Sequence, residues 1–190
     1  MSKIIAIMLL LCCGMMLFGC ADDNGRRKAE QQKTIVVTDS VGRKVELPYP
    51  LERVAVCNVY NAELITAVGA IDKIVGVDNY IFKDQSGFKN RFNEAQVFGI
   101  SQNAMNYEKL AELAPQAVII TGEGTWRDAQ EMLDRFGIKV IVINSYYTDQ
   151  FADNCRLIGR IFGREEQAEE LVNYFNDKLA YIQKQLQGVP

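Results

Sequence analysis

Short apolar runs, rich in β-branched residues, alternate along this chain with helix-like stretches. Strands buried on both faces read as such continuous runs. Parallel neighbours need a crossover connection, which is usually a helix, so strands spaced in this way join in parallel. The sequence therefore predicts an α/β fold, in which a Rossmann-like lobe has a central, mostly parallel sheet flanked by helices. The expected strands lie at residues 54–57, 73–77, 96–98, 117–121 and 139–143.

The stretches between these runs end with residues that commonly terminate helices. Gly69, Pro115, Gly137 and Gly163 each follow a stretch with helical character. Glycine adopts the left-handed conformation that closes many helices, and proline cannot continue one. The expected helices cover residues 63–68, 107–113, 127–136 and 149–162.

The two ends of the folded region have patterns of their own. Residues 34–38 and 44–47 flank the turn sequence Asp39-Ser40-Val41-Gly42 and predict a hairpin. Residues 165–187 form one long amphipathic helix, with apolar residues recurring every three or four positions and charged residues on the opposite face. The apolar stripe continues beyond what a lobe of this size would cover, so we expect its last turns to be unburied. The stripe consists of Ala168, Leu171, Val172, Phe175, Leu179, Ile182 and Leu186.

The N-terminus has the pattern of a secretory signal peptide. Lys3 is followed by an apolar run from 4 to 18, which at about 1.5 Å per residue is shorter than a bilayer core of about 30 Å. The run ends in Leu-Phe-Gly-Cys, which resembles a bacterial lipobox and implies that Cys20 is lipidated. We therefore expect a lipoprotein signal peptide at 1–19 and a polar tether at 20–33. An uncleaved anchor and a plain secreted protein are the alternatives.

The remaining two cysteines, Cys57 and Cys155, fall in apolar surroundings. Two unpaired, buried thiols are the expected state, although a disulfide between them is left open by the sequence. The sequence has no C-x-x-C pair and no histidine, so we expect neither structural zinc nor any other protein-bound metal.

Composition also narrows the classes of function. The absence of histidine excludes Ser-His-Asp and Cys-His catalysis. A net charge of −3, from 21 basic and 24 acidic residues, gives no strong attraction for nucleic acid. The only G-x-G is Gly122-Glu123-Gly124, with Arg127 at the place of the third glycine, and no Walker lysine motif occurs. We therefore expect neither an enzyme nor a resident cofactor.

Candidate binding residues follow the ends of the expected strands, because ligands of doubly wound sheets bind beyond the carboxyl ends of the strands. Aromatic and amide side chains gather there, and rigid rings with one polar group give a ligand a large contact area and a group that orients it. Arg43, Arg53 and Arg127 are candidates for binding carboxylates, but the first two lie where a structural role is expected. The ligand-binding candidates are Asn58, Tyr60, Tyr80, Phe82, Gln102, Trp126, Tyr146 and Tyr147.

Several motifs in order resemble one family, the substrate-binding proteins of ABC importers for ferric siderophores, haem and cobalamin. The motifs are TDSVGRKVELPYPLERVAV, NAELITAVGAIDKIVGV, MNYEKLAELAPQAVII, GIKVIVI and IGRIFGREEQAEELV. Gln116 departs from the family pattern, in which an aspartate is usual. The resemblance implies an extracytoplasmic binding protein that delivers an iron or cobalt chelate to an ABC permease and its ATPase. It also implies that Glu108 docks on the permease.

The same resemblance implies two lobes joined by the long helix. We therefore expect residues 34–163 to form the N-terminal ligand-binding lobe and residues 164–190 the interlobe helix, with the C-terminal lobe missing from this sequence. The rival hypothesis is a surface adhesion or assembly lipoprotein that uses the same lobe without a small ligand.

The lipobox resemblance makes the first testable prediction. Wild-type protein in a bacterial host should fractionate with the membrane and carry a diacylglycerol on Cys20, because the thiol follows the apolar run directly. Cys20→Ala should be released or misprocessed. Intact-mass spectrometry and membrane fractionation check both; an unmodified wild-type mass with unchanged fractionation of the variant would contradict the prediction.

Overall fold

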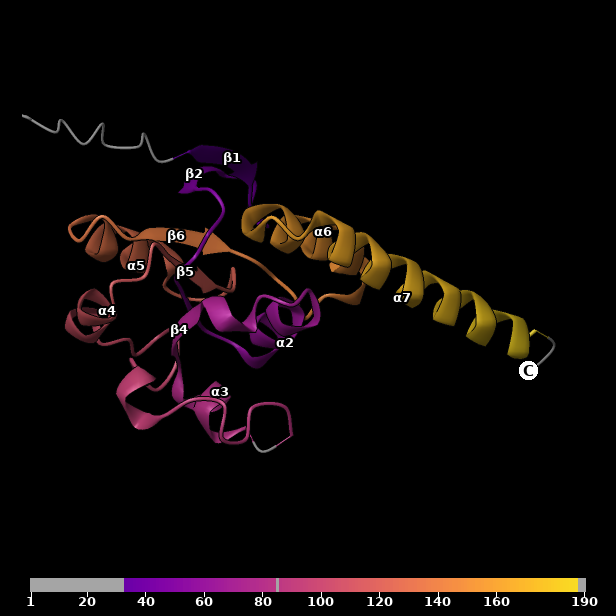
Figure 1. Ribbon diagram of the computed structural model, residues 1–190, viewed down its shortest axis with the longest axis horizontal. Helices are drawn as coiled ribbons and strands as arrows, with labels where there is room; N and C mark the ends of the chain where they lie inside the picture. Colours follow the sequence, from indigo (N-terminus) through magenta and orange to yellow (C-terminus); the bar gives the residue numbers. More distant parts are fainter. Residues whose placement is uncertain (1–32, 85, 188–190) are drawn as a thin grey trace, which may run out of the picture. The chain divides into compact units, whose positions relative to one another are not determined.

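The computed structural model describes residues 33–84 and 86–187 (Figure 1). The expected signal peptide, Cys20 and the tether up to residue 32 lie outside the described residues, as do residues 188–190. Within the described ranges, no helix combines the length and the apolar character needed to span a bilayer.

A four-stranded parallel sheet forms the centre of the described part and confirms the expected α/β class (Figure 1). Its order is β4-β3-β5-β6, so β3 lies between the strand that follows it and β5. The strand that follows β3 in the chain therefore lies on one side of it, and the next two strands lie on its other side. The strands are β3 (Val54–Val56), β4 (Ile74–Val77), β5 (Ala117–Ile120) and β6 (Lys139–Val142).

Helices connect the strands and cover both faces of the sheet (Figure 1). The connections contain α2 (Val59–Ala67) after β3, α3 (Asn79–Lys83) and α4 (Tyr107–Leu113) after β4, and α5 (Trp126–Asp134) after β5. The long C-terminal region adds α6 (Phe151–Phe162) and α7 (Glu165–Gln185). Short 3-10 turns lie at Ile71–Lys73, Glu94–Gln96 and Thr148–Gln150.

Alternating side chains of β3, β5 and β6 enter two different cores. Val56 and Ile119 belong to the core under α2, α6 and the start of α7. Their strand neighbours Ala55 and Val118 belong to the core under α4 and α5. Because both faces are covered, the strands are apolar apart from Lys139 at the start of β6, which is why they appear in the sequence as short apolar runs.

The expected hairpin is present as β1 (Thr34–Thr38) and β2 (Lys44–Pro48), which pair antiparallel. The buried carboxylate of Asp39 fixes its turn, since it accepts hydrogen bonds from the backbone N–H of Arg43 at 2.9 Å and from the Arg43 guanidinium at 2.6 and 3.0 Å. Arg43 also donates to the carbonyl oxygen of Val140 at 3.2 Å. This arginine is therefore structural, as its place in the sequence indicated.

Three local expectations differ from the structure. Residues 96–98 are expected as a strand, but Gln96 ends the 3-10 turn Glu94–Gln96 and Val97 makes one isolated parallel bridge with Val77. The capping side chain of Asn93 favours that turn. Helix α2 begins at Val59, four residues before the expected start, because Asn58 caps it. Helix α3 was not expected, and it forms because Asp78 caps its first turn.

Helices α6 and α7 meet at a close contact. A Cβ atom on Gly159 would lie 2.5 Å from the Cβ of Ala168 and 2.9 Å from the carbonyl oxygen of Arg164, so only glycine fits there. The rings of Phe151 and Phe175 stack with centroids 4.1 Å apart. The start of α7 is thus packed on the lobe through small and aromatic residues.

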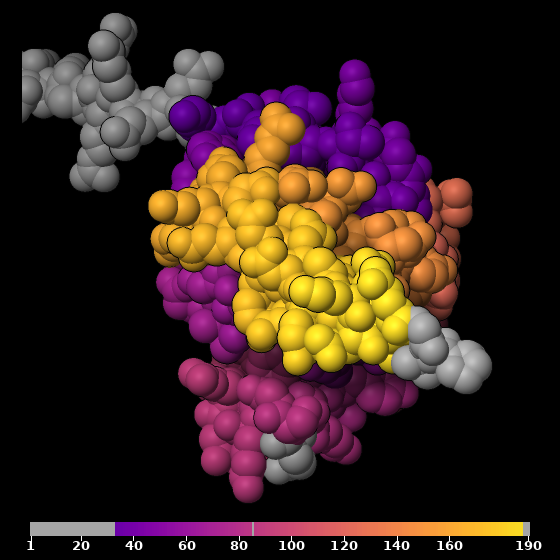
Figure 2. Space-filling model, turned by 90° about the vertical axis from the view of Figure 1, so that its right-hand side faces the viewer, coloured from indigo at the N-terminus to yellow at the C-terminus, as the bar shows by residue number. Residues whose placement is uncertain are grey.

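The second half of α7 is exposed, as the length of its apolar stripe predicted. Val172 is 1% exposed, whereas Leu179 is 41%, Ile182 50% and Leu186 58% exposed. Figure 2 shows this end of the helix in yellow, with no other described residues lying over it. The apolar stripe therefore continues from a buried contact into solvent.

Two isoleucines on these helices give the second prediction. Ile158→Ala on α6 should lower the free energy of unfolding by about 2 to 5 kcal/mol, because its fully buried side chain would leave a cavity. Ile182→Ala on α7 should change it by about 0.5 kcal/mol or less, since half of that side chain is exposed. Urea unfolding of the full chain measures both; similar losses would show that the end of α7 is buried.

Candidate ligand-binding site

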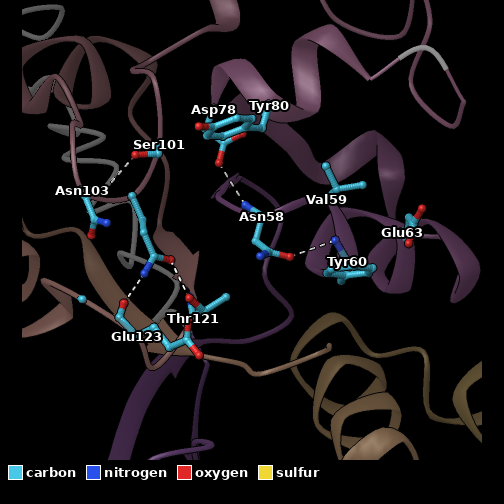
Figure 3. A pocket seen from close by; sticks show the side chains of 12 residues that line it. Asn58, Val59, Tyr60, Glu63, Asp78, Tyr80, Ser101, Asn103, Thr121 and Glu123 are labelled. Carbon is cyan, nitrogen blue, oxygen red and sulfur yellow. Dashed lines mark hydrogen bonds between the residues drawn. The ribbon is translucent and has the colours of Figure 1, made fainter. Parts of the chain in front are cut away.

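A cleft of about 590 Å³ opens beyond the carboxyl ends of β3, β4 and β5 (Figure 3). It lies where the strand order reverses, which is the usual ligand position in open α/β sheets. The cleft is lined by Asn58, Val59, Tyr60, Glu63, Asp78, Tyr80, Ser101, Gln102, Asn103, Thr121, Glu123 and Gly124.

The buried carboxylate of Asp78 ties together the ends of two strands and the starts of two helices. It accepts hydrogen bonds from the backbone N–H of Asn58, after β3, and of Ile81, in α3, both at 3.0 Å. Burial raises the pKa of Asp78 above its usual value, and the backbone hydrogen bonds from Asn58, Ile81 and Tyr80 oppose that rise. Burial, assisted by the Asp78 charge, also raises the pKa of the neighbouring Cys57 thiol.

Two tyrosines project from the first turns of the helices that Asp78 joins. Asn58 has a positive φ of 78°, and its side-chain oxygen accepts the Tyr60 N–H at 2.9 Å, which caps α2. Tyr60 is 54% exposed, and Tyr80 at the start of α3 is 63% exposed. Figure 3 shows Asn58, Tyr60 and Tyr80 around one part of the cleft. These rings are accessible surfaces rather than core residues.

Gln102 holds another part of the cleft wall in place. Its side-chain oxygen accepts from the N–H and the hydroxyl of Thr121, at 3.0 and 2.8 Å, and its amide nitrogen donates to the carbonyl oxygen of Glu123. The loop before α4 is thereby fixed to the end of β5. Both ends of the Gln102 amide are hydrogen-bonded inside the protein, so this residue helps to fix the shape of the cleft.

Tyr146 and Tyr147 lie beside the cleft and contact its rim. The Tyr146 hydroxyl donates to the Glu123 carboxylate at 3.0 Å, and the two tyrosine rings are 4.3 Å apart. Burial is the main cause that raises the pKa of Tyr146, followed by hydrogen bonds to Tyr147 and Glu123. The phenol is therefore neutral at physiological pH, and its role in the free protein is to orient Glu123.

Two of the candidates lie elsewhere. Phe82 is half-buried against the larger core, and Trp126 is 8% exposed in the smaller one. The guanidinium carbons of Arg43 and Arg127 each lie 4.2 Å from the centre of the Trp126 ring. Neither Phe82 nor Trp126 lines the cleft, because the short helix α3 and the start of α5 turn these rings inward.

The structure adds residues that the sequence reasoning did not select. These residues could have been found from their positions in the chain rather than from their residue types. Most of them directly follow a strand or lie one helical turn from a selected residue. The candidates were chosen among aromatic and amide side chains, so carboxylates and hydroxyls at neighbouring positions were not selected. The added cleft residues are Val59, Glu63, Asp78, Ser101, Asn103, Thr121, Glu123 and Gly124.

Glu108 lies outside the cleft, exposed in the first turn of α4. The side chain of Asn106 caps this helix by accepting the Lys109 N–H at 2.9 Å. Arg53, the other arginine of the entry segment, donates to the carbonyl oxygens of Ala114 and Leu113 at 3.1 and 2.6 Å. It is structural, as expected.

Both cysteines of the described ranges are free and buried, which confirms the expected unpaired thiols. Burial raises the pKa of Cys155 to about 11, so this thiol is protonated and poorly reactive at neutral pH. Among residues 33–84 and 86–187, no group of three or more cysteine, aspartate or glutamate side chains is arranged to hold a metal ion.

The model of one protein family, described as "Periplasmic binding protein", matches residues 54–189. A periplasmic solute binding protein from Veillonella parvula is 28% identical, with a TM-score of 0.67 over 83% of this chain and 50% of its own length. The petrobactin-binding protein YclQ from Bacillus subtilis is 18% identical, with a TM-score of 0.69 over 82% of this chain and 54% of its own.

A third solved structure, the molybdate-binding protein MolA from Haemophilus influenzae, is 20% identical, with a TM-score of 0.72 over 82% of this chain and 55% of its own. The chain thus spans about half the length of the solved structures that it matches. A comparison with curated protein sequences finds no match.

The raised pKa of Asp78 gives the third prediction. Because the folded-state pKa lies above the unfolded value of about 3.9, the folded protein binds the proton more tightly. The contribution of Asp78 to stability is therefore full below the unfolded pKa and is lost as pH rises through the folded pKa. Asp78→Asn cannot titrate, so the free energy of unfolding of wild type minus that of the variant should grow as pH falls from about 7 to about 3.5.

Urea unfolding at a series of pH values measures this difference. Asp134→Asn, an exposed carboxylate at the end of α5, is the matched control and should give a smaller change. A difference for Asp78→Asn that is flat or falls toward acid pH would contradict the prediction.

Proposed function

The chain belongs to the periplasmic binding protein family, and from this premise we propose that it binds a metal chelate outside the cytoplasm and delivers it to an ABC permease. The expected ligand is a ferric siderophore, haem or cobalamin. The observation that carries this proposal is the cleft at the strand-order reversal, with Tyr60 and Tyr80 exposed at its wall.

The size and chemistry of the cleft support a ligand of this kind. A volume of about 590 Å³ lies within the range of about 300–1,000 Å³ that is common for small-molecule sites. Tyrosine rings give a large contact area to a flat or bulky chelate and provide a hydroxyl to orient it. The names of the petrobactin- and molybdate-binding neighbours also favour a small ligand.

We further propose that the cleft is one side of a complete site. Residues 34–163 would form one ligand-binding lobe, and residues 164–190 would connect it to a facing lobe. Two observations support this division: the chain spans about half the length of its structural neighbours, and the apolar side chains at the end of α7 are exposed. One lobe covers one side of a ligand, so we expect this chain alone to bind weakly.

The partners follow from the same proposal. A lipid on Cys20 would anchor the protein to the outer side of the cell membrane, and the exposed carboxylate of Glu108 would contact basic residues of the permease. An exposed ion pair contributes only about 0 to 1 kcal/mol, so Glu108 would set orientation more than affinity.

The fourth prediction tests the ligand class. Calorimetric titration of the full chain with ferric siderophores, haem and cobalamin should find at least one ligand. If a complete site binds at about 1 nM, near −12 kcal/mol, half of that free energy is about −6 kcal/mol, so the dissociation constant should be tens of micromolar or weaker. Tyr60→Ala and Tyr80→Ala should each weaken binding roughly three- to tenfold. Tyr181→Ala, which removes an equally exposed ring from α7, should leave affinity unchanged.

Two outcomes would contradict parts of this proposal. Submicromolar binding by this chain alone would rule out the half-site, and no binding of any chelate would favour the adhesion or assembly role.

The fifth prediction separates docking from binding. In cells that carry the importer, Glu108→Gln should reduce chelate uptake while calorimetry shows unchanged affinity, because the side chain lies outside the cleft. Glu112→Gln, exposed on the same helix, is the control. Loss of affinity in Glu108→Gln, or unchanged uptake, would argue against a docking role.

A further inference from the structure

The described residues that line the cleft carry negative charges and no positive ones. Among the twelve, Glu63, Asp78 and Glu123 are carboxylates, and none is lysine or arginine. The others supply phenols, amides, hydroxyls and small apolar groups. Glu63 and Glu123 come from α2 and from the loop after β5, so their charges lie on different parts of the wall (Figure 3).

The helix ends at the cleft do not compensate for these charges. A helix N-terminus normally attracts anions through its free N–H groups. Here the Asp78 carboxylate already accepts the N–H groups of Asn58 and Ile81, and the Asn58 side chain accepts that of Tyr60. The position that an anionic ligand would take at the start of α3 is thus occupied by the buried Asp78 carboxylate, and at the start of α2 the Asn58 side chain caps the Tyr60 N–H.

The exposed side chains of the cleft also disfavour an anionic ligand. Glu63 and Glu123 are exposed, and the Glu123 carboxylate is held at the rim by the Tyr146 hydroxyl at 3.0 Å. The ring faces of Tyr60 and Tyr80 attract cations, because the electron-rich face of an aromatic ring carries partial negative charge. A negatively charged ligand would meet these groups without an arginine or lysine of the lining to pair with it.

We propose that this cleft selects metal chelates that are uncharged or positively charged and discriminates against anionic ones. The proposal rests on the proposed function, since it names the class of chelate that the same site takes. A ferric trihydroxamate or a neutral corrinoid fits this class, whereas ferric tricatecholates and carboxylate-type siderophores, which carry net negative charge, do not.

Three probes with one metal core test the proposal on the full chain. Ferrioxamine B has one positive charge on its terminal ammonium, its N-acetyl derivative is neutral, and its N-succinyl derivative has one negative charge. Calorimetric titration at low salt should rank their affinities in that order, with roughly a fivefold loss per step, as expected for single charges near carboxylates in water. The differences should shrink at about 0.5 M salt, where exposed charges are screened.

Variants identify the source of the ranking. Glu63→Gln and Glu123→Gln keep the shape of each side chain and remove its charge, and each should raise the relative affinity of the N-succinyl probe severalfold. Glu170→Gln changes the net charge equally on the exposed face of α7 and should leave the ranking as in wild type. Unfolding midpoints measured for each variant confirm that the fold is retained.

The possible failures are distinguishable. Binding of the N-succinyl probe as tight as that of ferrioxamine B, or a ranking that Glu170→Gln alters as much as the cleft variants do, would overturn the charge selection while leaving the proposed function intact. If none of the three probes binds and haem and cobalamin also fail to bind, the proposed function itself is wrong, and the charge selection falls with it.

Discussion

Burial of the sheet on both faces governs where this chain places its polar chemistry. Helices cover each face, so most side chains of the four parallel strands enter one of two apolar cores. Three of the buried polar residues directly follow strand ends and are hydrogen-bonded within the protein: Asp78 after β4, Thr121 after β5 and Asn144 near the end of β6. The cleft is the place where these strand ends leave room for a ligand.

The same burial explains which parts of the fold were predictable. Strands hidden on both faces produce apolar runs, and the four strands of the sheet were recognised from those runs within one residue at each end. Helix α3 and the true start of α2 were missed, because both depend on single capping side chains, Asp78 and Asn58, rather than on a pattern that repeats. The positions of loops were predictable, and the local conformation within them was not.

The choice of site residues by residue type was limited for a similar reason, because it could not predict local conformation. Tyr60 and Tyr80 line the cleft because each begins a helix at the end of a strand. Trp126 and Phe82 occupy similar positions in the sequence, yet their rings enter the cores. The direction of a side chain on a first helical turn depends on how that helix packs, and packing involves residues far away along the chain. Glu63 and Glu123 were passed over because exposed carboxylates are common on any surface.

The burial of Cys57 and Cys155 protects their thiols if the protein works in an oxidising compartment. Both thiols are fully enclosed in the native fold and unpaired. An unfolded chain, in contrast, presents them to disulfide-forming catalysts, and a bond between them would join two residues that the native fold buries in different cores. Folding therefore protects the two thiols from oxidation, because the core that stabilises the lobe also keeps their sulfur atoms away from oxidants.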